Sequence, residues 1–177
     1  FSALAGLRQF LDMSFGVGFL NLVYYDGDTM RVVADGVSSA GGIAANADYS
    51  QLYVAFTTDH VVGIYDRDQT SGDITFRTSV DVGMGVDNLD VAADGSIWAA
   101  GHPKSITLAQ HFMSGGKTPS PSQVSRIPMT DGDPGAREDI YFDTGEELSA
   151  SAVAATYGGK MLVGSITAKN FLLCDLP

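Results

Sequence analysis

VDNLDVAADGSIWAAGHP, residues 86–103, predicts a β-strand, a tight Asp-Gly turn and a returning strand. Asp87 and Asn88 lie where the first strand begins, and His102 lies just before Pro103 where the second strand ends. Because the two outer ends of a hairpin lie at the same edge of a sheet, we expect these polar groups to be neighbours. That edge is therefore the place to look for a metal site.

Two further segments repeat this pattern. Residues 42–55 and 151–164 each predict a short strand, a turn and a returning strand. Leu52 in the first copy and Ile97 in the hairpin above occupy matching positions 45 residues apart. Met161 matches them in the third copy, 64 residues after Ile97. The chain therefore contains an internal repeat.

A more polar pair of strands is predicted after each of the first two copies, at 60–65 with 74–77 and at 105–108 with 123–127. A four-stranded unit that recurs at this interval is typical of a β-propeller blade, since one twisted sheet cannot bury its faces without neighbours. We therefore predict an all-β fold. The chain holds about three to four such units and propellers close with roughly four to eight blades, so it would supply about half of a ring. An open sandwich has short strands too, but it does not predict the repeat.

The rest of the chain fits around these units. Residues 3–13 carry leucines at helical spacing and predict a short amphipathic helix. Residues 18–34 predict a hairpin, which is half of a small sheet. Residues 114–136 are rich in Gly, Pro and Ser and predict a long loop, which explains the longer third interval. Residues 1–177 are thus interpreted as part of one propeller domain.

The composition is that of an acidic globular chain. Among 177 residues there are 21 Asp and Glu against 10 Lys and Arg, which gives a formal charge of −11. Such a surface repels phosphate backbones and anionic lipids, so nucleic acids and membrane surfaces are poor partners. It suits a divalent cation, or it serves solubility alone. No apolar run reaches the ~18 to 20 residues of a membrane span.

The two ends of the sequence raise separate questions. Phe1 is not an initiator Met, and no signal peptide with a charged start and cleavage site follows it, so we expect an internal or processed start. Cys174 is the only cysteine. By itself it is compatible with a buried thiol or with a bridge to a different chain.

The candidate chemistry lies in the hairpin over residues 86–103. Asp87 and Asn88 place a carboxylate and an amide oxygen side by side, and calcium takes about 6 to 8 such oxygens, normally from several loops. The alternative is that both side chains satisfy backbone donors in a turn. His102, whose backbone Pro103 restricts, can orient a substrate or transfer a proton near neutral pH, or it is an ordinary surface histidine. The motifs of serine hydrolases, zinc proteases and P-loop proteins do not occur.

These residues resemble the paraoxonase/arylesterase family, whose wider group includes strictosidine-synthase-like propellers. Val-Asp-Asn at 86–88, followed by Trp-Ala-Ala-Gly-His-Pro at 98–103, is similar to the family's Val-Asp-Asn and its Trp-Val-Gly-Cys-His-Pro-like strand end. Residues 22–25, 31–36, 152–164 and 173–176 fit the same register. The resemblance covers nearly the whole chain and corresponds to the C-terminal half of the family.

The resemblance implies a six-bladed β-propeller with calcium in its central tunnel. Such a protein hydrolyses lactones or aryl esters through a metal-polarised carbonyl and an activated water. Carried over, Asp87 and Asn88 would bind the catalytic calcium, and His102 would be the catalytic-site histidine at the mouth of the pocket. A second, structural calcium and the other ligands would belong to the N-terminal half.

The resemblance also implies a partner chain. Phe1 falls between the third and fourth blades of the family, so we hypothesise a precursor that is cleaved there, with its two halves remaining together. Cys174 would match the cysteine that joins the last blade to the N-terminal strand by a disulfide. That bridge would require secretion or another oxidising compartment.

One position departs from the family pattern. Where the family has Asn-Gly-Ile with the Asn as a calcium ligand, this chain reads Ala-Gly-Gly-Ile, and Gly41 takes the Asn position. Losing one of about five protein oxygens weakens calcium binding or opens a coordination position for water. Two hypotheses therefore stand: a calcium-dependent hydrolase, and a related propeller that has lost this hydrolysis and binds a small molecule or catalyses another reaction, with or without calcium.

Overall fold

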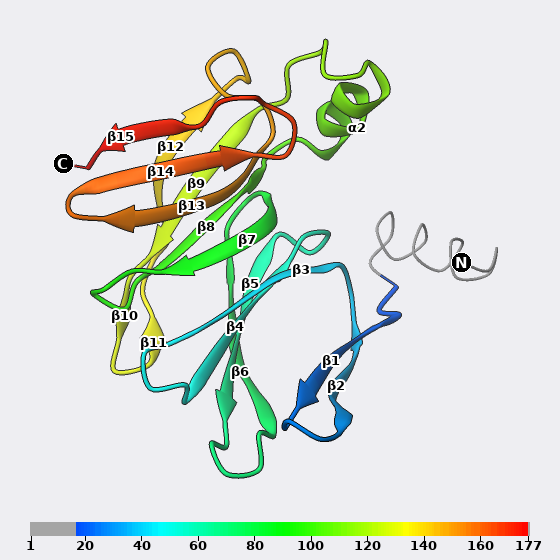
Figure 1. The fold of residues 1–177 in the computed structure, drawn as a ribbon, viewed down its shortest axis with the longest axis vertical. Coiled ribbons are helices and arrows are strands. Elements are labelled where there is room, and N and C mark those ends of the chain that lie inside the picture. Colours follow the sequence, from blue (N-terminus) through cyan, green and yellow to red (C-terminus); the bar gives the residue numbers. More distant parts are fainter. Residues whose placement is uncertain (1–16, 177) are drawn as a thin grey trace.

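A computed structural model describes residues 17–176 as a series of small antiparallel sheets, with one helix among them (Figure 1). The all-β prediction is confirmed for this part of the chain. The helix predicted over residues 3–13 lies outside the described residues. The elements are β1 (Leu20–Tyr25), β2 (Met30–Val37), β3 (Ala40–Ala45), β4 (Gln51–Phe56), β5 (Val61–Arg67), β6 (Ile74–Asp81), β7 (Gly85–Val91), β8 (Ile97–His102), α2 (Ser105–Met113), β9 (Ser122–Ile127), β10 (Met129–Thr130), β11 (Asp133–Pro134), β12 (Glu138–Asp143), β13 (Ser151–Tyr157), β14 (Lys160–Ser165) and β15 (Leu172–Asp175).

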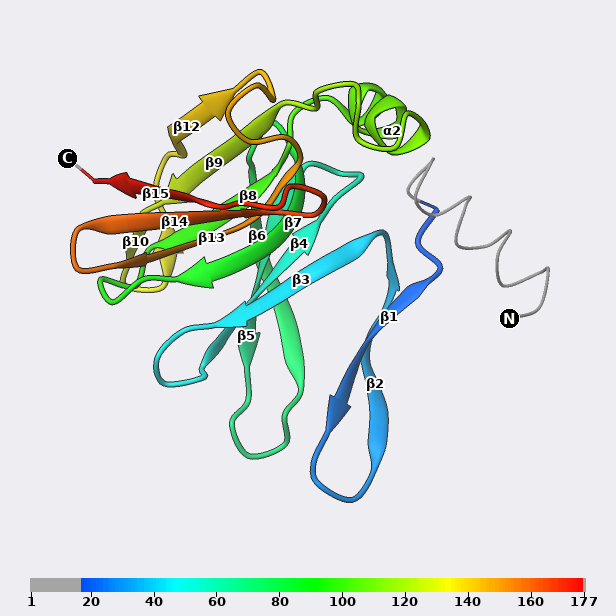
Figure 2. The ribbon, with the colours of Figure 1, turned by 45° about the horizontal axis from the view of Figure 1, so that its top comes forward.

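The sheets follow one another along the chain. Their strand orders are β1-β2, β3-β4-β5-β6, β12-β9-β8-β7 and β13-β14-β15, and β10 and β11 form a separate small ladder. The first strands of the three larger sheets, β3, β7 and β13, lie next to one another, with β7 in the middle (Figure 2). Successive meandering sheets with adjacent first strands are what a partial propeller requires.

The predicted repeat is confirmed by the strand pairing. β3 pairs with β4, β7 with β8 and β13 with β14, each as an antiparallel hairpin. Leu52, Ile97 and Met161 all lie in the second strand of their hairpin. The hairpin predicted over residues 18–34 is formed by β1 and β2.

Two predictions about the second unit are wrong. Residues 105–108 are predicted as a strand, but they form the start of α2. The outer pair of this sheet consists instead of β9 and β12. The long loop predicted over 114–136 is interrupted, because β9 and the small β10–β11 ladder lie within it.

Tertiary contacts explain the helix at this place. Ile106 and Thr107 are β-branched and favour a strand locally. His111, further along α2, is buried, and its Nδ1 lies 2.6 Å from the carbonyl oxygen of Thr118. Its Nε2 lies 2.7 Å from the hydroxyl oxygen of Thr167, which follows β14. The contact with Thr167 joins residues 56 apart and holds the segment against the last sheet, and no local pattern encodes it.

The core consists of buried clusters between neighbouring sheets. One lies between the β3–β6 sheet and the β7–β8 hairpin and includes Ile64 and Ile97. Another lies between β8, β9 and the β13–β14 hairpin and includes Trp98 and Met161. Side chains alternate along β8, so Ile97 faces the first cluster and Trp98 the second. All six residues of β8 are therefore buried.

Candidate functional site

The β7–β8 hairpin brings its polar ends together. Gly85 pairs with His102, which places the start of β7 beside the end of β8. The Oδ2 atom of Asp87 lies 3.7 Å from Nε2 of His102. This distance is too long for a hydrogen bond but close enough for a charge contact if the imidazole is protonated. The side chain of His102 is buried, whereas that of Asp87 is 28% exposed.

Asn88 ties this hairpin to the last sheet. Its Nδ2 donates a hydrogen bond to the carbonyl oxygen of Ala152 in β13 at 3.0 Å, and it lies 3.3 Å from Oδ1 of Asp87. Within residues 17–176, no hydrogen bond is donated to the amide oxygen of Asn88. That oxygen therefore stays available to a ligand.

Asp87 differs from the aspartates of the turns. Asp48 and Asp94 each accept a hydrogen bond from a backbone N–H two residues further on, as Asx turns do. Among the described residues, no backbone N–H donates to the side chain of Asp87 or Asn88. The alternative in which this pair only satisfies a turn therefore finds no support in its contacts.

A β-bulge occurs at the same place in each of the three inner strands. The pairing registers shift around Gly41 in β3, around Asp87 in β7 and around Ala152 in β13. Bulges redirect a side chain and are common next to active sites. Gly41, Asp87 and Ala152 are thus equivalent positions. Sequence reasoning missed Ala152, because a bulge is defined by the partner strand.

Gly41 lies directly against Asp87. An ideal Cβ built on Gly41 would be 3.0 Å from the carbonyl oxygen of Asp87 and 3.0 Å from Oγ1 of Thr57. The hydroxyl of Thr57 donates a hydrogen bond to the carbonyl oxygen of Val86 at 2.6 Å. Thr57 is thus a further residue of the site. No sequence signal marked it, since it lies in the connection between β4 and β5.

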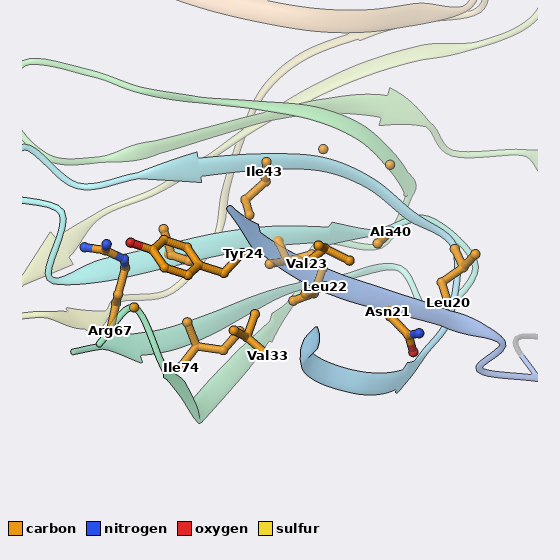
Figure 3. Close-up of a pocket in the computed structure, with 15 residues that line it drawn as sticks. Leu20, Asn21, Leu22, Val23, Tyr24, Val33, Ala40, Ile43, Arg67 and Ile74 are labelled. Carbon is orange, nitrogen blue, oxygen red and sulfur yellow. The ribbon is translucent and has the colours of Figure 1, made fainter. Parts of the chain in front are cut away.

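An apolar pocket of about 560 Å³ opens beside Gly41, between the β1–β2 hairpin and the β3–β6 sheet. Figure 3 shows that Leu22 and Tyr24 of β1 line this pocket, with Arg67 beside the Tyr24 ring. Among the residues that the structure describes, no carboxylate and no histidine lines it. It can hold an apolar group, but it supplies no acid or base. The lining residues are Leu20, Asn21, Leu22, Val23, Tyr24, Val33, Ala40, Gly41, Gly42, Ile43, Leu52, Val54, Arg67, Gly72 and Ile74.

The donor set at the start of β7 fits part of a calcium site. The Asp87 carboxylate and the amide oxygen of Asn88 are hard oxygens of the kind calcium prefers, but two are too few. Over residues 17–176, no three His, Cys, Asp and Glu side chains gather so that they could hold a metal ion. Nδ1 of His102 is buried, and it has no hydrogen-bond partner in the described part of the chain. A complete site would need oxygens from elsewhere.

Cys174 lies apart from this site. It is a half-buried free thiol on β15, the outer edge strand of the last sheet. Burial raises the pKa of its thiol, and the nearby carboxylates of Glu147 and Asp175 raise it further. The thiol is therefore protonated at neutral pH and is a poor nucleophile by itself.

No helix in the described range 17–176 is long and apolar enough to span a membrane.

The meandering sheets are consistent with part of a β-propeller, and Asp87, Asn88 and His102 at one hairpin form a candidate cation site. The family model described as Arylesterase matches residues 4–176, so the chain belongs to the arylesterase family. The resemblance to paraoxonases and arylesterases seen in the sequence is thereby confirmed.

Individual relatives agree with this assignment. The chain is 31% identical over 166 residues to serum paraoxonase/arylesterase 1 of Rattus norvegicus, covering 93% of this chain and 45% of the relative. It is 34% identical over 167 residues to serum paraoxonase/lactonase 3 of Mus musculus, covering 94% and 46%. The chain therefore spans about half the length of the curated relatives it matches.

A solved structure shares the fold. The luciferin-regenerating enzyme superposes with a TM-score of 0.51 at 14% sequence identity, over 77% of this chain and 40% of that one. At this identity the likeness concerns the fold alone.

Proposed function

We propose that this chain forms about half of a six-bladed β-propeller hydrolase that cleaves lactones or aryl esters with the help of calcium. Membership of the arylesterase family supports the class of reaction. The observation that carries the site is the Asp87 carboxylate, which no backbone donor within residues 17–176 engages and which faces His102 across the hairpin. Bound calcium would polarise the carbonyl of the ester.

Asp87, Asn88 and His102 would have different roles in this reaction. Asp87 and Asn88 would hold the ion through a carboxylate and an amide oxygen. The bond from Asn88 to the Ala152 carbonyl fixes the amide plane, so its free oxygen keeps one direction. His102 would hold or transfer a proton at Nε2, the ring nitrogen that faces Asp87.

A complementary N-terminal half, as a separate chain, would complete the ring. The sheets at both ends of the arc carry exposed apolar side chains, which mark surfaces that a partner covers. On the first hairpin Val23 and Val32 are 57% and 52% exposed, and on the last sheet Leu162 and Leu173 are 41% and 62% exposed. The pocket of Figure 3 lies beside the first hairpin, so part of it would be covered by the same partner. The partner would also supply the missing calcium ligands.

Calcium content and hydrolysis test this proposal together in the assembled protein, that is, this chain with its complementary half. After dialysis we expect stoichiometric calcium in the unaltered protein and its loss in Asp87→Asn. Hydrolysis of lactones and aryl esters should fall by about two orders of magnitude. Asp90→Asn, which removes a carboxylate from the same strand, is the matched control and should retain both. Unchanged metal and activity in Asp87→Asn would refute the mechanism.

Gly41 favours a second candidate, a propeller that has lost this hydrolysis and binds a small molecule or catalyses another reaction. At the bulge where Asp87 provides a carboxylate, Gly41 provides no side chain. This function predicts that the unaltered assembled protein hydrolyses neither substrate class, and absence of calcium after dialysis would favour it over the first candidate.

Cys174 would join the two halves by a disulfide in a secreted protein, since it lies on the open edge strand of the last sheet. Non-reducing electrophoresis should show one band that separates into two on reduction, and Cys174→Ser should show two bands without reductant. A light band that is the same with and without reductant would contradict the bridge.

A further inference from the structure

Thr57 joins the first four-stranded sheet to the start of β7. Its backbone N–H donates a hydrogen bond to the carbonyl oxygen of Ser39 at 3.1 Å. Its hydroxyl donates to the carbonyl oxygen of Val86 at 2.6 Å, across the boundary between the two sheets. Val86 is fully buried and directly precedes Asp87. One side chain therefore reaches from one sheet to the backbone that carries the candidate metal ligands.

Glycines on both sides give Thr57 its space. A Cβ on Gly41 would lie 3.0 Å from the Thr57 hydroxyl oxygen, and a Cβ on Gly85 would lie 3.3 Å from its methyl carbon. Both distances are shorter than ordinary van der Waals contact. The same Cβ on Gly41 would be 3.0 Å from the carbonyl oxygen of Asp87. A side chain at position 41 would thus displace either the Thr57 hydroxyl or the backbone of Asp87.

We propose that Thr57 is a positioning residue for the Asp87–Asn88 pair and that Gly41 makes the room it needs. The Val86 carbonyl lies in the same rigid peptide plane as the N–H of Asp87. Holding that plane at the bulge fixes the direction in which the Asp87 carboxylate leaves the strand. Gly41 and Thr57 then act as one unit. This inference rests on the proposed calcium site.

Variants at position 57 test the hydroxyl directly. In the assembled protein, calcium affinity is measured by calorimetry and by terbium luminescence. Thr57→Val keeps the shape of the side chain and removes the hydrogen-bond donor, so calcium affinity should fall about 10-fold or more. Thr57→Ser keeps the donor and should retain the calcium affinity of the unaltered protein. Thr75→Val, on an exposed position of β6 in the same sheet, is the matched control and should bind calcium normally. Equal melting temperatures of the two valine variants in chelator would exclude general unfolding as the cause.

Variants at position 41 test the shared space. Gly41→Ala should weaken calcium binding about as much as Thr57→Val does. When it is added to Thr57→Ala it should cost little more, because the hydroxyl that it displaces is already absent. Fully additive losses would contradict the idea of a single unit.

The outcomes separate this inference from the proposed function. If Asp87→Asn loses calcium while Thr57→Val binds it normally, the positioning role is wrong and the calcium site stands. If the unaltered protein binds no calcium, the proposed function fails, and amide hydrogen exchange then decides the role of Thr57. Faster exchange at Val86, Asp87 and Asn88 in Thr57→Val than in Thr75→Val would support positioning, and equal exchange would overturn it.

Discussion

The sheets in the middle of the chain and the sheets at its two ends differ in how many faces are covered. Ile97 in β8 and Val54 in β4 are fully buried, whereas Val23 in β1 and Leu173 in β15 are 57% and 62% exposed. All four are apolar residues in regular strands, so the strand sequence does not account for the difference. Within the described range 17–176, a middle sheet has a neighbouring sheet on each side, and an end sheet has one. Burial in this chain is therefore supplied by the adjoining sheet.

The largest expected effect compares Ile97 in a middle sheet with Val23 in an end sheet. Ile97→Ala removes a side chain that is 0% exposed and should lower the free energy of unfolding by about 3 to 4 kcal/mol, because it leaves a cavity between two sheets. Val23→Ala, on the first hairpin, removes side-chain atoms from a residue that is 57% exposed and should cost roughly 0.5 kcal/mol or less. Urea denaturation of the two variants measures both values. Equal losses would mean that the two regions do not differ in packing.

The next effect distinguishes the isolated chain from the assembled protein. Leu173 lies on the exposed face of β15 and Leu172 packs against the buried cluster around Trp98. Leu173→Ser should leave the isolated chain almost unchanged but destabilise the assembled protein by about 2 kcal/mol, because only there is its side chain covered. Leu172→Ser should cost stability in both forms. Thermal unfolding provides the measurement, and no effect of Leu173→Ser on the assembled protein would show that this face stays uncovered.

The smallest effect concerns charges. Ser96, through its hydroxyl and its N–H, and Arg126 lower the pKa of Asp94 to about 2. A carboxyl whose pKa is lowered on folding adds stability above its unfolded pKa and loses it as the pH falls through the folded value. Asp94→Asn should therefore cost about 0.5 to 1 kcal/mol at pH 7, since the pair is partly exposed, and the difference should shrink between about pH 4 and pH 2. Unfolding curves across this range would show it.

The end sheet offers the control for this effect. Asp175 pairs with Lys160 on β14 and is 82% exposed. Asp175→Asn should leave unfolding unchanged at either pH, because an exposed pair is screened by water and salt. A loss as large as that of Asp94→Asn would show that the end sheet relies on its charges as much as the middle sheet does.

The repeated hairpins, and the proximity of Asp87 and His102 in the candidate site, were predictable from the sequence. Short apolar segments on either side of an Asp-Gly turn specify β7 and β8 locally, and antiparallel pairing then places Asp87 beside His102. The helix α2 was not predictable, because its buried His111 bonds to Thr167, 56 residues away. The bulge at Asp87 was missed for the same reason, since it exists only relative to the partner strand.

The sequence by itself determined the three repeated hairpins, their turns and the polar ends of one of them, because these depend on residues close together in the chain. Only the tertiary structure decided what Gly41 contacts. The family resemblance interprets it as a missing ligand, whereas in the fold it borders the Thr57 hydroxyl and the Asp87 carbonyl. Contacts between sheets depend on backbone approach over tens of residues, which no local pattern of side chains specifies.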